Sequence, residues 1–589
     1  MTLTLPRCQQ MLLVALSLSL LACAGRTPDF TVADELAAKA RDTAVHCDAP
    51  LNRCAIDSPL HHLDLPSNRH HLMLLEQGEA SLVTRVHMIR AAREQILLQN
   101  YVINDDEVSR FLLDELVDAA RRGVQVRILA DAFISMPDTT LQAAIEKAHS
   151  NLELRLYNPM RDAAAMNNSQ FFTAMFCCFR QLNHRMHNKV FSIDGEHAIL
   201  GGRNTAGRYF DMDTRMNYLD VEVLVSGSEV TAIDASFFEY WEHGLVRPAR
   251  HTRDVAASLH DSQAREVIYE GNSRHQYIID QAEDPKWLPG QWETRGFLVD
   301  SVQYFSDPPG KALLSEPDPL RDSTQLLHNL METAEHRVVI QSPYLVMSRR
   351  FEDVLRNLNG IEILFSSNSL GSTDAFPVYA ISRRQRQRML DDYAMRVFEM
   401  KPFPGQVELF VPRYPTLIEE KEAGIETPML REPRSPTREM PGPRLSLHGK
   451  ILIVDDHTAV VTAHNFDPRS EVYNTENGII VHDTAFAAAL NDFIELTIAP
   501  ENSWESGMRE SRIGVLGAIN RRMAGLSRRL PTLDLWPTHA TENFNQPDPE
   551  DNPLPRADRA VGEYPEVRLG RRMATSFISR MMGFTRPLM

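Results

Sequence analysis

The sequence predicts an α/β protein made of two similar domains that meet at a shared site. First, 589 residues are too many for one hydrophobic core and suit two domains. Second, one motif occurs twice, as a His, a Lys two residues later, an Asp five after that and an Asn ten further on. The two sets are His187, Lys189, Asp194 and Asn204, and His448, Lys450, Asp455 and Asn465. Third, strand–helix–strand patterns accompany both copies.

The first 22 residues indicate a secretory signal, because Arg7 precedes a short apolar run at 11–21 that ends in small residues. An uncleaved anchor helix is the alternative. Leu20-Leu21-Ala22-Cys23 resembles a bacterial lipobox. This resemblance implies that Cys23 is lipidated and anchors the protein at the periplasmic face of a membrane, and Ala24 favours the outer membrane.

The predicted organisation follows from shifts in composition along the chain. We expect a lipoprotein signal at 1–22, a tether at 23–65, a first domain at 66–260, a linker at 261–315, a second domain at 316–500 and a partly disordered extension at 501–589.

Each domain begins with alternating strands and helices. In the first, strands at 96–102 and 124–129 flank a helix at 108–122 that Gly123 ends, and a further helix starts at Thr140. In the second, strands at 338–346 and 361–365 flank a helix at 349–358 before Gly360. Such alternation predicts right-handed crossovers and a mainly parallel sheet.

Each motif is predicted to lie on a strand–turn–strand unit. Residues 190–193 and 451–454 are β-branched or aromatic runs, with partner strands at 198–200 and 459–461. Side chains two apart on a strand share a face, so each His projects with its Lys. Two such pairs predict one site at a pseudo-twofold interface.

Two imidazoles and two amines fit a phosphodiester substrate. One imidazole can attack phosphorus while the other protonates the leaving alcohol and then deprotonates the incoming one. The lysines neutralise phosphoryl charge, so neither a metal nor another cofactor is required. A single His-x-Lys would fit an ordinary strand edge equally well, but the identical spacing of two copies argues against that reading.

The paired motifs resemble the H-x-K-x-x-x-x-D motifs of the phospholipase D superfamily, and their flanks resemble bacterial cardiolipin synthases of the C-type branch. These flanks are Arg185-Met186-His187-Asn188-Lys189, Gly201-Gly202-Arg203-Asn204, Ser342-Pro343-Tyr344, Asn368-Ser369-Leu370, Ser372-Thr373-Asp374, 465–470 and Asn474-Thr475-Glu476. The resemblance covers about residues 70 to 500. It implies two α/β/α sandwich domains, an active site between them and a nucleophile on the first motif. The residues alone leave His187 and His448 interchangeable.

Acidic residues near each motif are candidates for orienting a histidine. Asp220 and Glu476 are proposed for that role, and Glu222, on the same predicted strand face as Asp220, competes with it. Asp194 and Asp455 belong to the motifs and are therefore included with the catalytic candidates His187, Lys189, His448 and Lys450. They follow the motif strands, where an Asp often bonds its own backbone, so we expect them to be more structural than chemical. Asn204 and Asn465 either donate to phosphate oxygens or cap turns.

The remaining segments add few constraints. Cys47 and Cys54 are spaced to form a disulfide in an oxidising periplasm, whereas Cys177 and Cys178 are expected to be buried thiols. Residues 412–445 are too polar for a core and are expected to flank the cleft. A basic helix is expected at 509–529 and disorder at 547–555. The basic, partly apolar tail at 568–589 suits either a membrane surface or solvent.

The predicted function is phosphatidyl transfer at a membrane surface, which makes cardiolipin from phosphatidylglycerol and a second phospholipid through a phosphatidyl-histidine. A hydrolase that releases phosphatidic acid is the nearest alternative, since both reactions use the same intermediate. A nucleic-acid phosphodiesterase is disfavoured by the net charge of −17. A catalytically idle scaffold is disfavoured by two intact His-Lys pairs. The sequence identifies neither the phosphatidyl donor nor an accessory protein.

Overall fold

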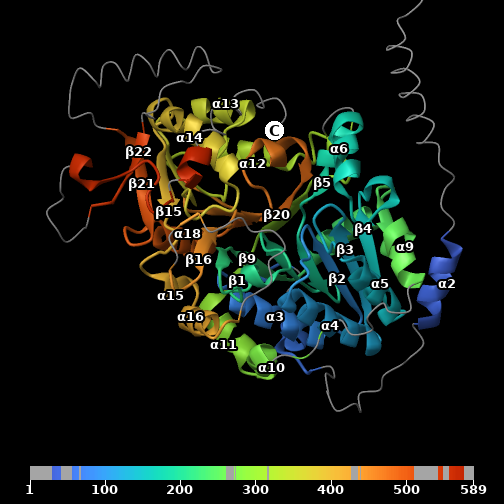
Figure 1. Cartoon of the computed structure of the whole chain (residues 1–589). Helices are drawn as coiled ribbons and strands as arrows, with labels where there is room; N and C mark the ends of the chain where they lie inside the picture. The colour runs from blue at the N-terminus through green and yellow to red at the C-terminus, as the bar shows by residue number, and fades with distance from the viewer. Residues whose placement is uncertain are drawn as a thin grey trace, which may run out of the picture.

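The computed structural model describes residues 30–40, 56–64, 68–260, 269, 271, 273–314, 318–425, 436–437, 440–509, 541–547, 556–568 and 570–575. Two large β-sheets, each covered by helices, lie side by side (Figure 1). The N-terminal half of the chain supplies one sheet, and the C-terminal half supplies the other.

The first sheet has the strand order β10-β4-β3-β2-β6-β7-β9-β1-β11. Its strands are β1 (His70–Leu75), β2 (Gln95–Asn100), β3 (Gln125–Asp131), β4 (Leu152–Tyr157), β6 (Val190–Ile193), β7 (His197–Gly201), β9 (Glu222–Ser226), β10 (Val246–Pro248) and β11 (Gly296–Val299). The strands β6 and β7 form the hairpin that follows the first motif.

The second sheet has the order β12-β20-β18-β17-β13-β14-β15-β21-β22-β23. Its strands are β12 (Val302–Ser306), β13 (Arg337–Gln341), β14 (Glu362–Asn368), β15 (Arg396–Met400), β17 (Ile451–Val454), β18 (Thr458–Thr462), β20 (Asn477–His482), β21 (Ser503–Met508), β22 (Thr541–Phe544) and β23 (Ala560–Gly562). Read from β15 to β12, this order repeats the first sheet from β4 to β1 strand for strand. The predicted duplication is therefore visible in the topology.

Helices cover both faces of each sheet. The first domain carries α3 (Gly78–Ala91), α4 (Glu107–Arg121), α5 (Thr139–Ala148) and α8 (Val230–Trp241); the second carries α12 (Ser323–Glu332), α13 (Arg349–Asn357), α14 (Phe376–Asp391) and α18 (Thr484–Ile498). On β9, Leu224 packs under α3 and α4, whereas Val223 and Val225 face the other way. Each domain is thus the predicted α/β/α sandwich.

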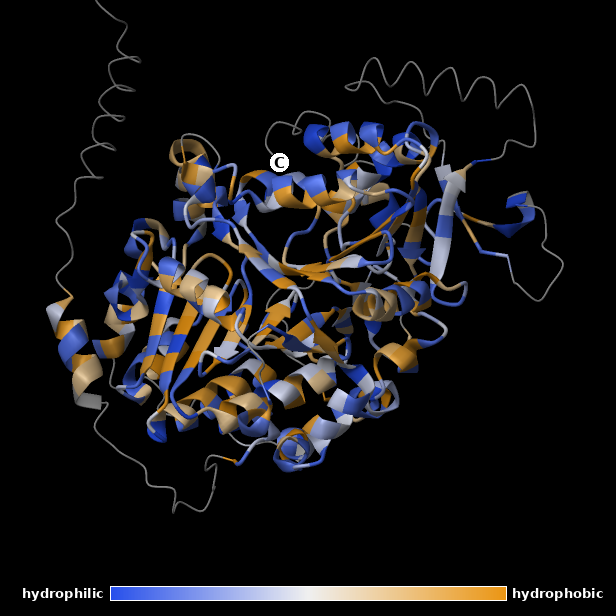
Figure 2. Cartoon of the chain, turned by 180° about the vertical axis from the view of Figure 1, so that it is seen from behind, coloured by the Kyte–Doolittle hydropathy of each residue, from blue (hydrophilic) through white to orange (hydrophobic). Residues whose placement is uncertain are grey.

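The two domains share one hydrophobic core. Val223 and Val225 of the first sheet belong to the same buried cluster as Ile451 and Ile453 of the second, together with apolar residues of α8 and α18. Figure 2 shows hydrophobic residues concentrated on the strands between the helical layers. Burying the inner faces of both sheets together stabilises the interface at which the two motifs meet.

The prediction of mainly parallel sheets is wrong. Only β2–β3, β3–β4, β13–β14 and β14–β15 are parallel, and the other paired strands of the two large sheets run antiparallel. The reason is that each motif strand returns through a tight turn, such as Asp194-Gly195-Glu196 between β6 and β7. A turn of this length joins antiparallel strands only.

The motif strands β6 and β17 have the predicted bounds, but each His and Lys lies just before its strand. Strand β13 ends at Gln341, five residues earlier than predicted, because Pro343 has no backbone N–H to donate to a sheet. Gly123 and Gly360 follow α4 and α13 with φ of 105° and 85°, a backbone conformation that favours glycine. As predicted, each glycine lies just beyond the end of its helix.

Two short parallel strand pairs join the domains directly. Strand β5 (Arg185–Met186) pairs with β19 (Asn474–Thr475), and β8 (Met216–Leu219) pairs with β16 (Arg444–Leu447). In each pair, one strand comes immediately before a motif histidine and the other leads into an acidic residue of the opposite domain.

Segments outside the two predicted domains also take part in the sheets. The segment predicted as a linker contains α10 (Gln276–Glu283), α11 (Trp287–Arg295) and the edge strands β11 and β12. The predicted C-terminal extension supplies β21, β22 and β23 to the second sheet. The described parts of the predicted linker and extension therefore belong to the domains they adjoin.

The expectation for Cys177 and Cys178 is wrong, because the two thiols form a disulfide between α6 (Asn168–Cys177) and α7 (Phe179–Asn183), and Cys177 is exposed. The predicted lipidation site Cys23, the Cys47–Cys54 pair and the basic helix beyond residue 509 lie outside the described residues. So do residues 548–555 and most of the tail. In the part of the chain that is described, no helix is long and apolar enough to cross a bilayer.

Candidate active site

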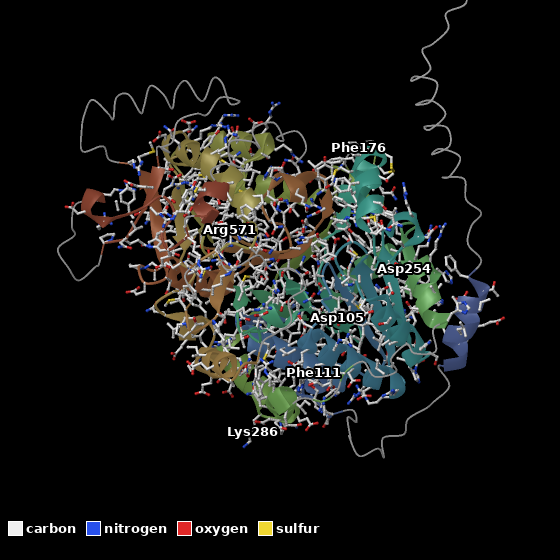
Figure 3. The ribbon with its side chains drawn as sticks, in the orientation of Figure 1. Asp105, Phe111, Phe176, Asp254, Lys286 and Arg571 are labelled. Carbon is white, nitrogen blue, oxygen red and sulfur yellow. A yellow bond between two sulfur atoms is a disulfide. The ribbon has the colours of Figure 1, made fainter. Side chains whose placement is uncertain are left out.

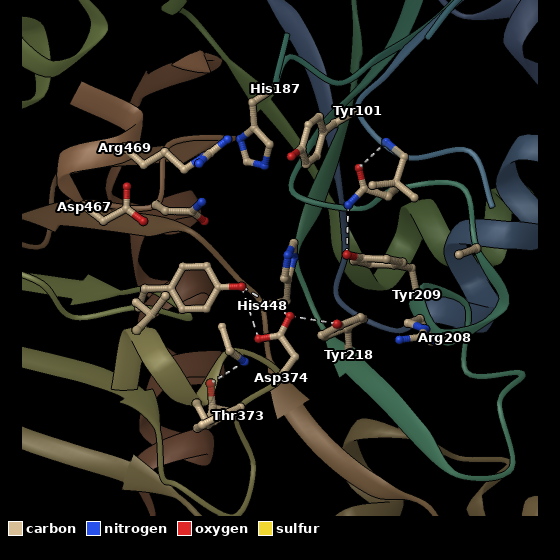
Figure 4. Close-up of a pocket in the computed structure, with 18 of the residues that line it drawn as sticks. Tyr101, His187, Arg208, Tyr209, Tyr218, Thr373, Asp374, His448, Asp467 and Arg469 are labelled. Atoms are coloured by element: carbon tan, nitrogen blue, oxygen red, sulfur yellow. Dashed lines mark hydrogen bonds between the residues drawn. The ribbon is translucent and has the colours of Figure 1, made fainter. Parts of the chain in front are cut away.

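The two motif histidines line one cavity of about 570 Å³ between the domains. Figure 4 shows their imidazoles on facing sides of this cavity, with Tyr101 beside His187 and Tyr209 and Tyr218 beside His448. Residues 261 positions apart in the chain are thus brought together, as the pseudo-twofold arrangement predicts.

The first half-site is built around His187. Its Nδ1 lies 2.6 Å from Oε2 of Glu476, and its backbone N–H donates to the carbonyl of Thr475 at 3.0 Å. The ring of Tyr101 packs edge-on at 4.8 Å between centroids. The Lys189 ammonium donates to the carbonyl of His187 at 2.6 Å. These contacts leave Nε2 of His187 as the ring nitrogen without a protein partner among the described residues.

The second half-site repeats the arrangement around His448. Its Nδ1 lies 2.5 Å from Oδ2 of Asp220, and its backbone N–H donates to the carbonyl of Leu219 at 2.6 Å. The rings of Tyr209 and Tyr218 each lie 5.0 Å from the imidazole between centroids. The Lys450 ammonium lies 2.9 Å from Nδ1 and donates to the carbonyl of His448 at 2.6 Å.

Each histidine is held by an acid from the opposite domain, and the two short strand pairs explain why. Strand β5 pairs in parallel with β19. The residues that directly follow these two strands, His187 and Glu476, therefore lie side by side. Pairing β8 with β16 places His448 beside Asp220 in the same way. A carboxylate at Nδ1 fixes the tautomer in which Nε2 can react. The Nε2 of His448 also lies 3.3 Å from the Lys450 ammonium.

Glu222, the competing candidate, does not contact a histidine in the described structure. Its carboxylate accepts from the guanidinium of Arg85 at 2.6 Å and from the hydroxyl of Ser81 at 2.6 Å, both on α3. The predicted strand is interrupted at Asp220, because β8 ends before this residue and β9 begins after it. Asp220 and Glu222 therefore do not lie on one continuous strand as predicted. Asp220 is therefore the acid of the second half-site.

The two acids differ in their ionisation. Burial raises the pKa of Glu476 to about 7, although Lys189 opposes the shift. Burial also acts to raise the pKa of Asp220, but the charges of His448 and Lys450 outweigh it and the pKa is lowered. At neutral pH Asp220 is an anion, whereas Glu476 is close to its midpoint.

The pKa values of the two histidines and the two lysines are lowered, which favours the neutral form of each side chain. Burial, followed by Lys450, lowers the pKa of His448 to about 4, and burial followed by Lys189 lowers that of His187 well below its usual value. Burial also lowers the pKa of Lys189 to about 7 and of Lys450 to about 8. Burial thus disfavours the charged form of each base, and a negatively charged group bound beside them would favour it again.

Asp194 and Asp455, which were included with the catalytic candidates, lie in the turns after β6 and β17. The carboxylate of Asp194 accepts from the backbone N–H groups of residues 93–95 at 2.8–2.9 Å. Asp455 accepts from residues 335–337 at 2.7–2.9 Å in the same pattern. Both have φ near 50° and neither lines the cavity, so both tie a turn to the start of a neighbouring strand.

Asn204 and Asn465 both line the cavity. The amide of Asn204 donates to the hydroxyl of Tyr209 at 2.8 Å, and its oxygen accepts from the backbone of Val102 at 3.1 Å. The side-chain oxygen of Asn465 is buried without a hydrogen-bond partner in the described structure. Asn204 therefore positions the wall of the second half-site, whereas Asn465 has unused hydrogen-bonding capacity towards the cavity.

Sequence reasoning assigned no role to the aromatic and acidic lining of the cavity, although Tyr344 and Asp374 lie in the flanking motifs named above. Tyr218 and Tyr344 both donate to Asp374, at 2.9 and 3.1 Å. Tyr101 and Tyr344 follow the equivalent strands β2 and β13, at the carboxyl ends of the parallel strands, where ligands bind in open α/β sheets. That position is the signal that could have identified them.

Four arginines also line the cavity and were missed: Arg208, Arg444, Arg469 and Arg571. The described residues contain no group of three or more His, Cys, Asp or Glu side chains arranged to hold a metal ion. The lining thus combines two imidazoles, each hydrogen-bonded to a carboxylate, with four arginine side chains. Such a set of groups is able to bind and react with a phosphodiester.

Comparisons with known proteins give the following findings. The family described as "Cardiolipin synthase, PLD-like domain" matches residues 86–241 and 327–496. An uncharacterised protein of Helicobacter pylori strain 26695 is 28% identical over 75% of this chain and 81% of its own length. Cardiolipin synthase C of Escherichia coli K12 is 26% identical over 79% of this chain and 92% of its own length. A phosphatidylserine synthase structure from Haemophilus influenzae gives a TM-score of 0.48 at 14% identity, over 73% of this chain and 86% of that one.

Proposed function

Because the chain belongs to the family of the cardiolipin synthase, PLD-like domain, we propose that it is a phosphatidyltransferase that makes cardiolipin from phosphatidylglycerol and a second phospholipid. The observation that supports this proposal most directly is a pair of histidines in one cavity, each held by a carboxylate. His187 and His448 each have Nδ1 engaged by a carboxylate from the other domain. A reaction in two steps, with one imidazole attacking and the other moving protons, needs two such groups.

In the first step, Nε2 of His187 attacks phosphorus of the donor lipid. A nitrogen–phosphorus bond forms and the bond from phosphorus to the headgroup oxygen breaks. His448 gives its Nε2 proton to that oxygen. In the empty cavity His448 is neutral, because burial and Lys450 depress its pKa to about 4. The negative phosphodiester favours the imidazolium, so His448 takes up a proton from solvent when the substrate binds.

In the second step, His448 accepts the proton of a phosphatidylglycerol hydroxyl. The glycerol oxygen attacks phosphorus, the nitrogen–phosphorus bond breaks and His187 is released. The Lys189 and Lys450 ammonium groups carry positive charge beside the histidines in both steps, where the phosphoryl oxygens gain negative charge. Water in place of the glycerol hydroxyl would make the same site a hydrolase that releases phosphatidic acid.

The carboxylates support this division of roles. Asp220 remains ionised and so stabilises a positive charge on His448, as an acid/base catalyst requires. Glu476 has a pKa of about 7 and gives weaker support to a charge on His187. A histidine that stays neutral is the better nucleophile, because its free nitrogen retains its electron pair.

The test is to incubate the purified protein with phosphatidylglycerol labelled in its acyl chains and to identify the products. The proposal expects labelled cardiolipin and free glycerol. Labelled phosphatidic acid alone would make the protein a hydrolase. Cleavage of nucleic acid without any phospholipid product would overturn the assignment of substrate class. His187→Ala and His448→Ala proteins are the matched negative controls.

We also propose that the protein works on a membrane surface at the periplasmic side of the cell envelope, anchored by a lipid on Cys23. Replacing Cys23 with Ser is expected to abolish labelling by radioactive palmitate and to leave the signal uncleaved. Normal labelling and processing of that variant would contradict the lipoprotein proposal.

An exposed apolar surface on α6 supports contact with a bilayer. Phe172 and Phe176 are 64% and 87% exposed, and Figure 3 shows Phe176 at the outer edge of the molecule. Helix α6 is connected to the site, because Phe171 stacks on Phe133 and the guanidinium of Arg185 lies 4.7 Å from the ring centre of Phe133. Exposed aromatic side chains insert readily into the interface of a bilayer.

The contribution of this surface is measured as the ratio of the rate on vesicles to the rate on a short-chain, water-soluble phosphodiester. Replacing both Phe172 and Phe176 with Ser is expected to lower the ratio about tenfold or more, since burial of each ring contributes about 1.5–3 kcal/mol. Leu320→Ser removes an equally exposed apolar side chain from another part of the surface and is the control. An unchanged ratio in the double variant would exclude α6 as the contact.

A further inference from the structure

The C-terminal segment at 556–575 forms part of the wall of the catalytic cavity, although it lies beyond the family match. Strand β23 pairs with β22, and Val567 forms a bridge with Thr437. Tyr564 and Val567 are buried against Leu370 and Tyr379 of the second domain. These contacts hold residues 570–575, a short helical segment, over the start of α14.

This segment places Arg571 in the cavity lining. Its guanidinium lies 4.2 Å from the ring centre of Phe376, which also lines the cavity. The Arg571 side chain is half-buried. The stacking contact fixes the direction of the guanidinium without using its hydrogen-bond donors.

Arg571 has no carboxylate partner among the described residues. Arg386, a fully buried arginine of the same domain, does have one, since it donates to Glu399 at 2.7 Å. Besides burial, the charge of Arg444 lowers the pKa of Arg571. Two guanidinium groups that repel each other in the wall of a cavity form a place where an anion is favoured.

The proposed reaction needs a second anion site. Phosphorus of the donor lipid is bonded to His187 after the first step, so the lysines beside the histidines are committed to that phosphoryl group. The acceptor phosphatidylglycerol carries its own phosphodiester, separated from the attacking hydroxyl by the glycerol carbons. That second negative charge must lie elsewhere in the same cavity, away from the first.

We propose that Arg571 forms the phosphate site of the acceptor phospholipid and thereby favours an anionic lipid over a neutral alcohol or water as the attacking group. This inference rests on the proposed phosphatidyl transfer and adds to it the recognition of the second substrate. Arg571 is a binding residue in this scheme and does not touch the reacting atoms. Arg444 assists by adding positive charge nearby.

The experiment measures how one enzyme-bound intermediate is divided between two acceptors. Labelled phosphatidylglycerol in mixed micelles is supplied with a fixed concentration of ethanol, and cardiolipin and phosphatidylethanol are quantified together. Both products arise from the same phosphatidyl-histidine, so their ratio reports the acceptor step alone. Donor binding and the rate of the first step cancel in this ratio.

Arg571→Gln is expected to lower the ratio of cardiolipin to phosphatidylethanol about tenfold, the effect of losing one charge-assisted hydrogen bond to a phosphate. Arg571→Lys is expected to restore part of it. Arg572→Gln removes the same charge from the adjacent position, where the side chain bonds the carbonyl of Val567 instead of lining the cavity, and should leave the ratio unchanged.

A ratio in Arg571→Gln equal to that of the unaltered protein would overturn the proposal. A proportional fall of both products would also overturn it, since Arg571 would then serve the donor or the folded state. If the unaltered protein forms no phosphatidyl product from either acceptor, the proposed function itself fails. That result is distinct, because it does not depend on any variant of Arg571.

Discussion

The two half-sites share one topology but differ in chemistry. In both, a histidine follows a short strand that pairs across the domains, and a carboxylate from the other domain holds Nδ1. In the first half-site that acid is Glu476, with a pKa raised to about 7; in the second it is Asp220, with a lowered pKa. The duplication thus supplies the same scaffold twice, and the choice of acid makes the two imidazoles unequal.

The surroundings enlarge this difference. Apart from burial, the pKa of His187 is depressed by the cations Lys189 and Lys450. For His448, Asp220 and also Asp374 act in the opposite direction and favour the imidazolium. Asp374 is held in the cavity by Tyr218 and Tyr344. We therefore propose that proton transfer belongs to the half-site with more negative charge, and attack on phosphorus to the other.

The largest expected effect comes from removing either histidine. His187→Ala and His448→Ala should each lower kcat by at least about 10⁴-fold with phospholipid substrates. The variants should differ with a nitrophenyl phosphodiester, whose leaving group needs no proton. His448→Ala should then accumulate an acid-labile phosphoramidate on His187, whereas His187→Ala should form none. A label found instead on His448 of the His187→Ala protein would reverse the roles.

Replacing the acids should have a smaller effect and an unequal one. We expect Asp220→Asn to lower kcat about 10³-fold or more, because His448 then carries its positive charge without a carboxylate. Glu476→Gln should lower kcat about 10²-fold, since His187 can act while neutral and Gln still fixes its orientation. Equal losses in the two variants, measured with a natural phospholipid, would remove the basis for assigning different roles.

The acid limb of the pH dependence of kcat should come from the first half-site. Glu476 must be ionised to accept the Nδ1 proton of His187, so activity should fall as the pH drops through about 7. Activity should also fall as the pH rises from about 7 to about 8, where first Lys189 and then Lys450 lose their charge. Glu476→Gln should abolish the acid limb, whereas Asp220→Asn should retain it, because the lowered pKa of Asp220 keeps that group out of this range.

Much of this comparison could be predicted from the sequence, because strand patterns and motif spacing are local. The bounds of β6 and β17, the cavity histidines and the candidate acids Asp220 and Glu476 followed from such patterns. The crossing of each acid to the opposite domain did not, since β5 and β19 are only two residues long and give no periodic signal. The antiparallel majority of the sheets was mispredicted because βαβ units near each domain start were extended to the whole sheet.

The turn aspartates should behave alike in both domains, which tests the symmetry outside the site. Asp194→Ala and Asp455→Ala each remove an acceptor for three backbone N–H groups and should lower Tm by about 1–3 °C. The value of kcat at 25 °C should stay within about twofold. A loss of activity comparable with that of the histidine variants would return these residues to the catalytic set.

The smallest expected effect is that of removing divalent ions. Positive charge in both half-sites comes from Lys189 and Lys450, so activity after exhaustive dialysis against EDTA should be the same as before. Activity that is lost and then restored by one divalent ion would contradict this. Repeating the assay with a short-chain, water-soluble substrate separates such a result from an effect of the ion on lipid packing.

The exchange of acids between domains has a consequence for biosynthesis. As the chain grows from its N-terminus, His187 is made long before Glu476, and Asp220 is made long before His448. An N-terminal fragment therefore carries one histidine without its acid and one acid without its histidine. Neither half contains a histidine together with its acid, so both half-sites form only when the whole chain has been made.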